Sequence, residues 1–357
     1  MSEWLMGIMR VVTTLALCVL GMIAGLLADR VGLPLPYMIG PLLASGTVAL
    51  ALPHVLPDGY GFPARLRLIF IAVIGLIIGA QVTPDLFANS SRLAISFAAL
   101  VLFVVICQGF NYWVFRRLGG YDRPTAFYAG SPGGLFESLA LGEEAGGDVA
   151  RLTLQQFLRI VIVVTALPIG LSIYLGTPVG SAAGMSFSTQ DVPWTDLPFV
   201  ALSGVVGLAL GHMLRLPAKQ LTGPMLVAAI LSLTGLFDID MPEWLIKLAQ
   251  IIVGTALGMR FTGLSRALVV RGVGLAALSV GGMLVVSAGF ATALIPLTGQ
   301  PFDVLLISFA PGGVTEMSLV ALSLQANPAF VTLHHILRIL ITVVGLVASA
   351  RFFKPAL

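Results

Sequence analysis

The sequence predicts an all-α membrane protein that crosses the bilayer many times. Hydrophobic residues make up 58% of its 357 residues and charged residues only 10%, and the mean hydropathy is +1.02. A typical soluble domain carries about 25% charged residues, so this chain cannot cover a water-soluble surface, and a soluble enzyme is excluded. Intrinsic disorder is excluded too, because disordered chains combine low hydrophobicity with high charge.

Apolar segments follow one another along the whole chain. A bilayer core about 30 Å thick requires roughly 20 mostly apolar residues in a helix, and several segments are shorter than that or interrupted by Gly and Pro. Interrupted segments at matching places in two halves are typical of transporter binding sites. The segments lie near residues 11–28, 34–52, 66–82, 92–115, 124–142, 151–175, 197–214, 221–236, 243–260, 267–295, 302–324 and 329–352.

The second half of the chain repeats motifs of the first in the same order, at spacings of 183 or 179 residues. They are Gly-Pro (40–41 and 223–224), SPGGLFE and APGGVTE (131–137 and 310–316), and QQFLR and HHILR (155–159 and 334–338). Chance matches would not keep nearly the same spacing over so many motifs. We therefore expect a duplicated chain, with a first membrane repeat at 1–175, an extracytoplasmic linker at 176–196 and a second membrane repeat at 197–357.

The distribution of Lys and Arg predicts the orientation. Cytoplasmic loops carry an excess of these residues, which places the loops at 116–123 and 260–271 and the C-terminus inside. The linker, with two Asp and no Lys or Arg, lies outside. The number of crossings agrees with these predicted sides of the membrane only if segments 124–142 and 302–324 enter and leave on one face, as re-entrant or broken helices. Each half then has five transmembrane helices plus one such helix, the repeats are inverted and both termini are cytoplasmic. Twelve crossings with parallel repeats are the alternative.

Both of these broken segments carry a Pro-Gly-Gly motif. Proline removes a backbone donor and glycine allows unusual dihedral angles, so the motif predicts a helix break. Such backbone is tolerated at membrane depth only inside protein or beside a wet cavity, and the new helix start is an anion site in principle. A tight hairpin without a binding role is the alternative. The candidate binding residues are Ser131, Pro132, Gly133, Gly134 and Glu137, and Ala310, Pro311, Gly312, Gly313, Thr315 and Glu316.

Two arginines occupy equivalent places in long apolar helices, Arg159 and Arg338. Arg338 lies roughly 14 Å into its segment, near the middle of the membrane. An arginine at that depth is costly unless it is paired, and it is a functional candidate by default. Two interpretations remain open: an internal ion pair with the glutamate of the same half, Glu137 or Glu316, or contact with an anionic substrate.

Two histidines, His334 and His335, lie one turn before Arg338 and are added to the candidate binding residues. A histidine here is able to take up protons or to bind a carboxylate, and a hydrogen-bonded polar residue at a helix interface is the alternative. Cys18 and Cys107 lie inside apolar stretches, and no Cys/His cluster has metal-ligand spacing. We therefore expect no metal site, no cofactor and no catalytic residue.

The doubled unit resembles the AbrB-type membrane protein family, also called the AbrB duplication family. The resemblance lies in Gly-Pro-(Leu/Met)-Leu early in each half and (Ser/Ala)-Pro-Gly-Gly-x-x-Glu later in each half, and it covers nearly the whole chain. Members carry two labels, regulator of gene expression and ammonia monooxygenase. The resemblance implies a bacterial inner-membrane location and an influence on the expression of other genes. The residues support neither a monooxygenase, which needs a copper or iron site, nor direct DNA binding.

The function that the sequence favours is a secondary transporter or exporter of a small anionic organic solute. It would work by alternating access at crossed Pro-Gly-Gly helix breaks. The alternative is a membrane sensor that affects gene expression without transport. The expected partners are the lipid bilayer and the solute, without nucleic acid and with a homodimer left open. We do not expect an enzyme.

Overall fold

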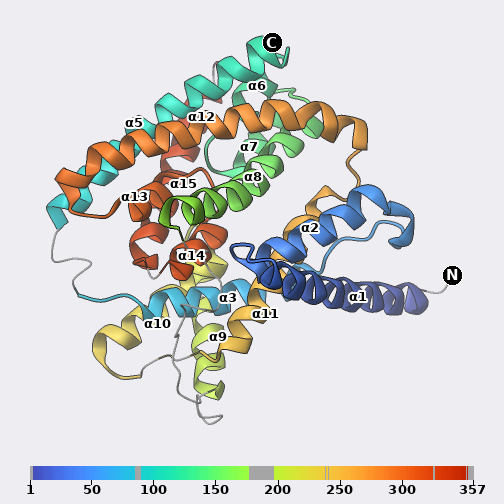
Figure 1. Ribbon diagram of the computed structural model, residues 1–357, viewed down its shortest axis with the longest axis horizontal. Helices are drawn as coiled ribbons and strands as arrows, with labels where there is room; N and C mark the ends of the chain where they lie inside the picture. Colours follow the sequence, from blue (N-terminus) through green and yellow to red (C-terminus); the bar gives the residue numbers. More distant parts are fainter. Residues whose placement is uncertain are drawn as a thin grey trace. The chain divides into compact units, whose positions relative to one another are not determined.

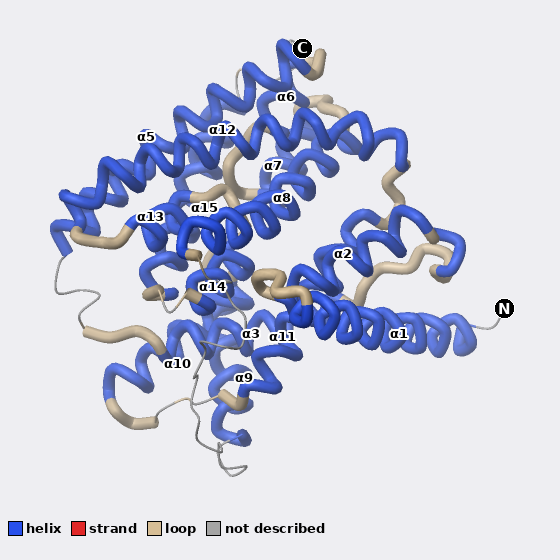
Figure 2. The backbone as a smooth tube through the Cα atoms, in the orientation of Figure 1, coloured by secondary structure: helices blue, strands red, loops and turns tan. Residues whose placement is uncertain are grey.

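The computed structural model describes residues 3–84, 90–176, 197–237, 239, 241–324, 326–350 and 352. Figure 2 shows helices joined by loops, with no strand among the described residues. This confirms the all-α prediction. The predicted linker lies outside the described residues except for Gly176, and so do Arg351 and Lys354, the basic residues that indicated a cytoplasmic C-terminus.

The helices coincide closely with the apolar segments of the sequence. The part of the chain that is described contains fourteen α-helices. They are α1 (Glu3–Arg30), α2 (Pro36–Ala51), α3 (Ala64–Ala80), α5 (Ser90–Trp113), α6 (Arg123–Ala129), α7 (Leu135–Glu144), α8 (Val149–Leu175), α9 (Leu197–Met213), α10 (Lys219–Thr234), α11 (Glu243–Gly258), α12 (Arg266–Thr298), α13 (Phe302–Phe309), α14 (Val314–Ser323) and α15 (Pro328–Ala350).

Six helices are long and apolar enough to cross a membrane, counted over the described residues. They are α1, α5, α8, α11, α12 and α15. The sequence predicted ten crossings. The other four of these, α2, α3, α9 and α10, have 16 or 17 residues, which corresponds to about 24 to 26 Å and falls short of a 30 Å core. Large apolar side chains are exposed along α1, α5, α8, α12 and α15, as contact with lipid requires, whereas most of α11 is buried. The chain is thus a multi-pass membrane protein.

The chain forms two compact units, and each unit takes helices from both predicted halves. Unit 1 comprises residues 1–84, 168–263 and 322–329, and unit 2 comprises residues 85–167, 264–321 and 330–357. The boundary between the predicted halves is therefore not a boundary between compact units. All the candidate binding residues lie in unit 2.

Unit 1 contains two matching helix pairs, α3 with α10 and α11 with α2, and α1 and α9 pack against α2 and α10. The paired helices approach so closely that only glycine fits at the contact. A Cβ atom at Gly75 would meet the carbonyl oxygen of Leu221, and one at Gly254 would meet the carbonyl oxygen of Met38. The same kind of contact therefore joins the early helices of one half to those of the other in both directions.

Unit 2 has α5 and α12 side by side, as Figure 1 shows. Three phenylalanines lie between them and α13. Phe103 meets Phe290 and Phe309 edge to face, with ring centroids 5.8 and 5.5 Å apart, and Phe290 stacks on Phe309 at 5.6 Å. Phe309 is the last residue of α13, so this packing holds the end of that helix against α5 and α12.

Candidate functional site

The first Pro-Gly-Gly motif interrupts a helix as predicted. Helix α6 ends at Ala129, α7 begins at Leu135, and the five residues 130–134 between them are buried. Gly134 takes a left-handed backbone conformation with φ of 60° and serves as the N-cap of α7. A side chain at this position would be strained, so the glycine sets the direction in which the chain leaves the break.

The second motif forms a corresponding break. Helix α13 ends at Phe309 and α14 begins at Val314. Both motif prolines and Gly312 are buried, whereas Gly313 and Thr315 are half-buried. The two glutamates lie in the first turns of α7 and α14, as predicted, with Glu137 exposed and Glu316 half-buried. A carboxylate there is stabilised by the helix dipole.

Both arginines are bonded to the break of their own half. Arg159 is 6% exposed and donates from Nη1 to the carbonyl oxygen of Ser131 at 2.5 Å. Arg338 is 1% exposed and donates to the carbonyl oxygen of Ala310 and, from Nη2 at 2.5 Å, to that of Gly312. Carbonyl groups at a helix break have no intrahelical donor, and a planar guanidinium supplies several N–H groups in one place.

The ion pairs considered from the sequence, Glu137–Arg159 and Glu316–Arg338, are absent: over the described residues, neither arginine lies within ion-pair distance of a carboxylate. Each arginine also keeps its buried Nε–H without a hydrogen-bond partner. The site therefore holds two cations with donor capacity left for an anion.

The residues three positions before the arginines play matching parts. Gln156 donates from Nε2 to the carbonyl oxygen of Tyr128 at 3.0 Å, and His335 Nε2 lies 3.0 Å from the carbonyl oxygen of Ile307. In each case the carbonyl lies 28 residues before the side chain that binds it. Since a carbonyl only accepts, His335 carries a proton on Nε2. Its buried Nδ1 has no partner.

His334 lies at a helix interface. Its Nδ1 is 2.9 Å from the carbonyl oxygen of Phe330 and its Nε2 is 2.9 Å from Ser96 Oγ of α5. The equivalent residue of the first half, Gln155, donates to Tyr121 Oη at 2.9 Å and to the carbonyl oxygen of Gly272 in α12 at 3.3 Å. Both positions thus link a helix of one half to a helix of the other.

Two donors at the breaks were missed by the sequence reasoning, Asn111 and Ser287. Asn111 of α5 donates to the carbonyl oxygen of Gly130 at 2.8 Å, and Ser287 of α12 donates to that of Phe309 at 3.3 Å. The available signal was a polar residue inside a long apolar helix. That signal is weak by itself, because many such residues only bond their own helix.

Hydroxyl groups line the first break. Ser131 Oγ is 2.5 Å from Ser138 Oγ, accepts from Gln156 Nε2 at 2.9 Å and donates to the carbonyl oxygen of Gly133 at 3.0 Å. The Oγ1 of Thr342, a buried residue of α15, has no hydrogen-bond partner among the residues that the structure describes. A Cβ atom at Gly133 would lie 3.1 Å from that hydroxyl and 3.6 Å from the carbonyl oxygen of Arg338. The backbone of Arg338 therefore lies beside the first break while its guanidinium binds the second.

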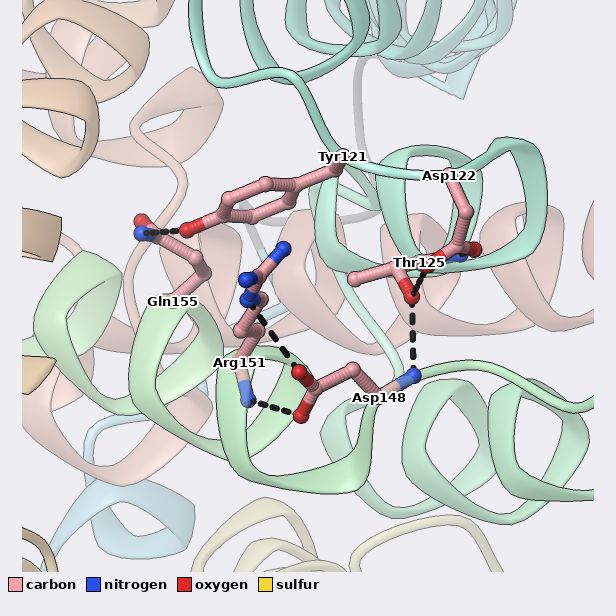
Figure 3. Close-up of polar contacts among 6 residues, drawn as sticks. All are labelled: Tyr121, Asp122, Thr125, Asp148, Arg151 and Gln155. Atoms are coloured by element: carbon pink, nitrogen blue, oxygen red, sulfur yellow. Dashed lines mark hydrogen bonds and ion pairs between the residues drawn. The ribbon is translucent and has the colours of Figure 1, made fainter.

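A polar network joins the N-terminal end of α6, the helix that leads into the first break, to the N-terminal end of α8 (Figure 3). Asp122 caps α6 by accepting from Thr125 N at 2.8 Å, and Thr125 Oγ1 accepts from Asp148 N at 2.8 Å. Asp148 pairs with Arg151 at 3.1 Å, and the Arg151 guanidinium lies 5.1 Å from the centre of the Tyr121 ring. Burial raises the pKa of the Tyr121 phenol, which the bond from Gln155 partly offsets.

No group of three or more His, Cys, Asp and Glu residues that could hold a metal ion occurs within the described ranges. The site contains backbone carbonyl oxygens that accept hydrogen bonds from side chains of the protein, two helix starts, and two buried guanidinium groups. Free N–H groups at helix starts and buried guanidinium groups are the kinds of group that bind anions in proteins.

Comparison with known proteins places the chain in a recognisable group. A family model described as "Transition state regulatory protein AbrB" matches residues 49–354. The "Putative regulator AbrB" of Escherichia coli (strain K12) is 25% identical over 347 residues, which cover 95% of each chain. The "Uncharacterized protein YhjN" of Bacillus subtilis (strain 168) is 26% identical over 344 residues, covering 89% of this chain and 87% of that protein.

Proposed function

This chain belongs to the AbrB family of membrane proteins, and from that premise we propose that it is a secondary transporter or exporter of a small anionic organic solute. The observation that carries the proposal is the pair of buried arginines at the helix breaks. Among the described residues, neither is paired with a carboxylate, and each keeps an unpartnered Nε–H. Burying a charge without a counter-charge is costly, and an anionic solute would supply that counter-charge while it is bound.

We also propose that the two halves are inverted repeats of five crossings and one broken helix each. The distribution of Lys and Arg supports the inverted orientation, and matching contacts within each half support the repeat itself. Arg159 binds a carbonyl 28 residues earlier, and so does Arg338. Inverted repeats with discontinuous helices near the middle of the membrane are the usual framework for alternating access. In this arrangement both termini are cytoplasmic and the protein lies in the bacterial inner membrane.

A membrane sensor that regulates gene expression without moving its ligand is the second candidate. It is favoured by the descriptions of the matching family model and of the Escherichia coli relative, both of which refer to regulation. The sensor would use the same anion site. Movement of solute across the membrane is what separates the two functions, because loss of a transporter also changes gene expression.

Uptake of radiolabelled organic acids into proteoliposomes tests the proposal. Gly133→Leu should abolish uptake, because its side chain would press on Thr342 and the Arg338 backbone. Gly109→Leu is the matched control in unit 2, since a Cβ atom there meets nothing within 4 Å. Equal uptake by wild type and a folded Gly133→Leu protein would refute the assignment of the site. Binding of an organic acid without uptake would favour the sensor.

A further inference from the structure

Backbone carbonyl oxygens at helix breaks are the groups that bind the coupling Na⁺ in many secondary transporters. In the first break of this protein, side-chain donors already occupy them. Gln156 Nε2 binds the carbonyl oxygens of Tyr128 at 3.0 Å and Ala129 at 3.3 Å. The next two carbonyls, those of Gly130 and Ser131, accept from Asn111 Nδ2 and Arg159 Nη1.

The second break is filled in the same way. The carbonyl oxygen of Ile307 lies at His335 Nε2, and that of Phe309 accepts from Ser287 Oγ. Two of the next three carbonyls, those of Ala310 and Gly312, both accept from the guanidinium of Arg338. Four carbonyl oxygens at the second break therefore accept hydrogen bonds from side chains of the protein itself.

The charge of these donors matters as much as their number. A guanidinium keeps its positive charge under all physiological conditions, so each break holds one fixed cation against its carbonyl oxygens. A free cation that entered would have to displace these N–H groups, and it would be repelled by both arginines at short range. Hard cations also need several oxygen ligands at once, and here four carbonyl oxygens of each break already accept hydrogen bonds from side chains.

We infer that Arg159 and Arg338 are tethered cations that take the place of a coupling Na⁺, so that solute binding at the breaks is independent of Na⁺. The inference rests on the proposed function, because a coupling ion matters only to a transporter. Arg338, with two carbonyl contacts to the motif, carries more of this role than Arg159, with one.

Thermal unfolding of the purified full-length protein in detergent tests the inference with simple ions as probes. Wild type is measured in NaCl, KCl and choline chloride at equal ionic strength, and the three melting temperatures should agree. Arg338→Ala should melt at a lower temperature and regain part of the loss in millimolar guanidinium chloride, which returns the missing cation. Arg151→Ala, which removes a half-exposed arginine of α8, should show no such recovery.

Stabilisation of wild type by Na⁺ over both K⁺ and choline, by roughly 2 °C or more, would overturn the inference. So would an Arg338→Ala protein as stable as wild type. If Arg338→Ala does not fold, Arg338→Lys replaces it. The lysine keeps the charge but not the two-pronged contact, so its melting temperature should be lower than that of wild type and still insensitive to Na⁺.

Solute uptake separates this inference from the proposed function. Equal uptake in NaCl and choline chloride supports both the transport function and the replacement of Na⁺ by the arginines. Uptake that requires Na⁺ supports transport but overturns the inference that the arginines replace Na⁺. If wild type moves no solute, the transport proposal fails, and the melting temperatures still decide whether the arginines replace Na⁺.

Discussion

Replacing His335 by glutamine or by alanine separates two roles for this residue. If His335 is a neutral hydrogen-bond donor, glutamine should serve in its place, because Gln156 performs the same task at the first break. If His335 takes up a proton during transport, glutamine should fail, since an amide does not titrate. Alanine removes the donor in either case and sets the scale of the effect.

The size of the alanine effect follows from the contacts. The carbonyl oxygen of Ile307 would lose His335 but keep the N–H of Ala310 at 3.3 Å, so the lost hydrogen bond should cost about 1 kcal/mol. The ring is fully buried, and the cavity that it leaves should cost about 2 kcal/mol more. We expect about 3 kcal/mol for His335→Ala and under about 1 kcal/mol for His335→Gln.

Unfolding of the purified protein by a denaturing detergent in mixed micelles measures both free energies, and uptake driven by a pH gradient measures function. The neutral-donor role requires His335→Gln to retain both stability and uptake. A stable His335→Gln protein that no longer responds to the pH gradient would refute our reasoning and assign the proton to His335. Gln156→His is the reciprocal variant, and it should also fold, with its imidazole donating to the Tyr128 carbonyl.

Two further predictions concern stability. Asp122→Ala should lower the free energy of unfolding by about 1 kcal/mol, because α6 loses its N-cap bonds to Thr125. An unchanged unfolding curve would show that the network of Figure 3 does not stabilise α6. Gly75→Ala and Gly254→Ala should each lower it by about 1 to 3 kcal/mol, because each added methyl group meets a carbonyl oxygen of the paired helix, whereas Gly7→Ala should have little effect. Markedly unequal losses at Gly75 and Gly254 would count against matched contacts in unit 1.

The positions of the helices and of their breaks could be predicted because they depend on local sequence. A run of apolar residues sets the extent of a helix, and Pro-Gly-Gly stops it whatever lies nearby. The predicted segments 124–142 and 302–324 are both divided where the motif stands, at residues 130–134 and 310–313. The lengths of α2, α3, α9 and α10 were less predictable, since a helix end responds to capping and tertiary contacts as well as to hydropathy.

The partners of Arg159 and Arg338 could not be predicted in the same way. A glutamate in the same half was the visible candidate for each, because opposite charges in a membrane usually pair. The structure uses backbone carbonyls instead. Every residue has a carbonyl, so such a contact leaves no mark in the sequence. Only the break itself, which strips carbonyls of their intrahelical donors, could have indicated it.

The two halves agree at the breaks and differ at the ends of the broken helices. Gln156 and His335 differ in chemistry but bind equivalent carbonyls, whereas the network around Asp122 has no counterpart of the same kind. At the spacing of 179 residues, Thr125 corresponds to Val304 and Arg151 to Phe330, whose side chains cannot form those polar contacts. Substitutions of the break donors should therefore have paired effects in both halves, whereas substitutions of the network should affect the first half alone. Paired losses of solute uptake are what a binding site shared by two repeats requires, whereas two breaks with only a packing role would show paired losses of stability alone.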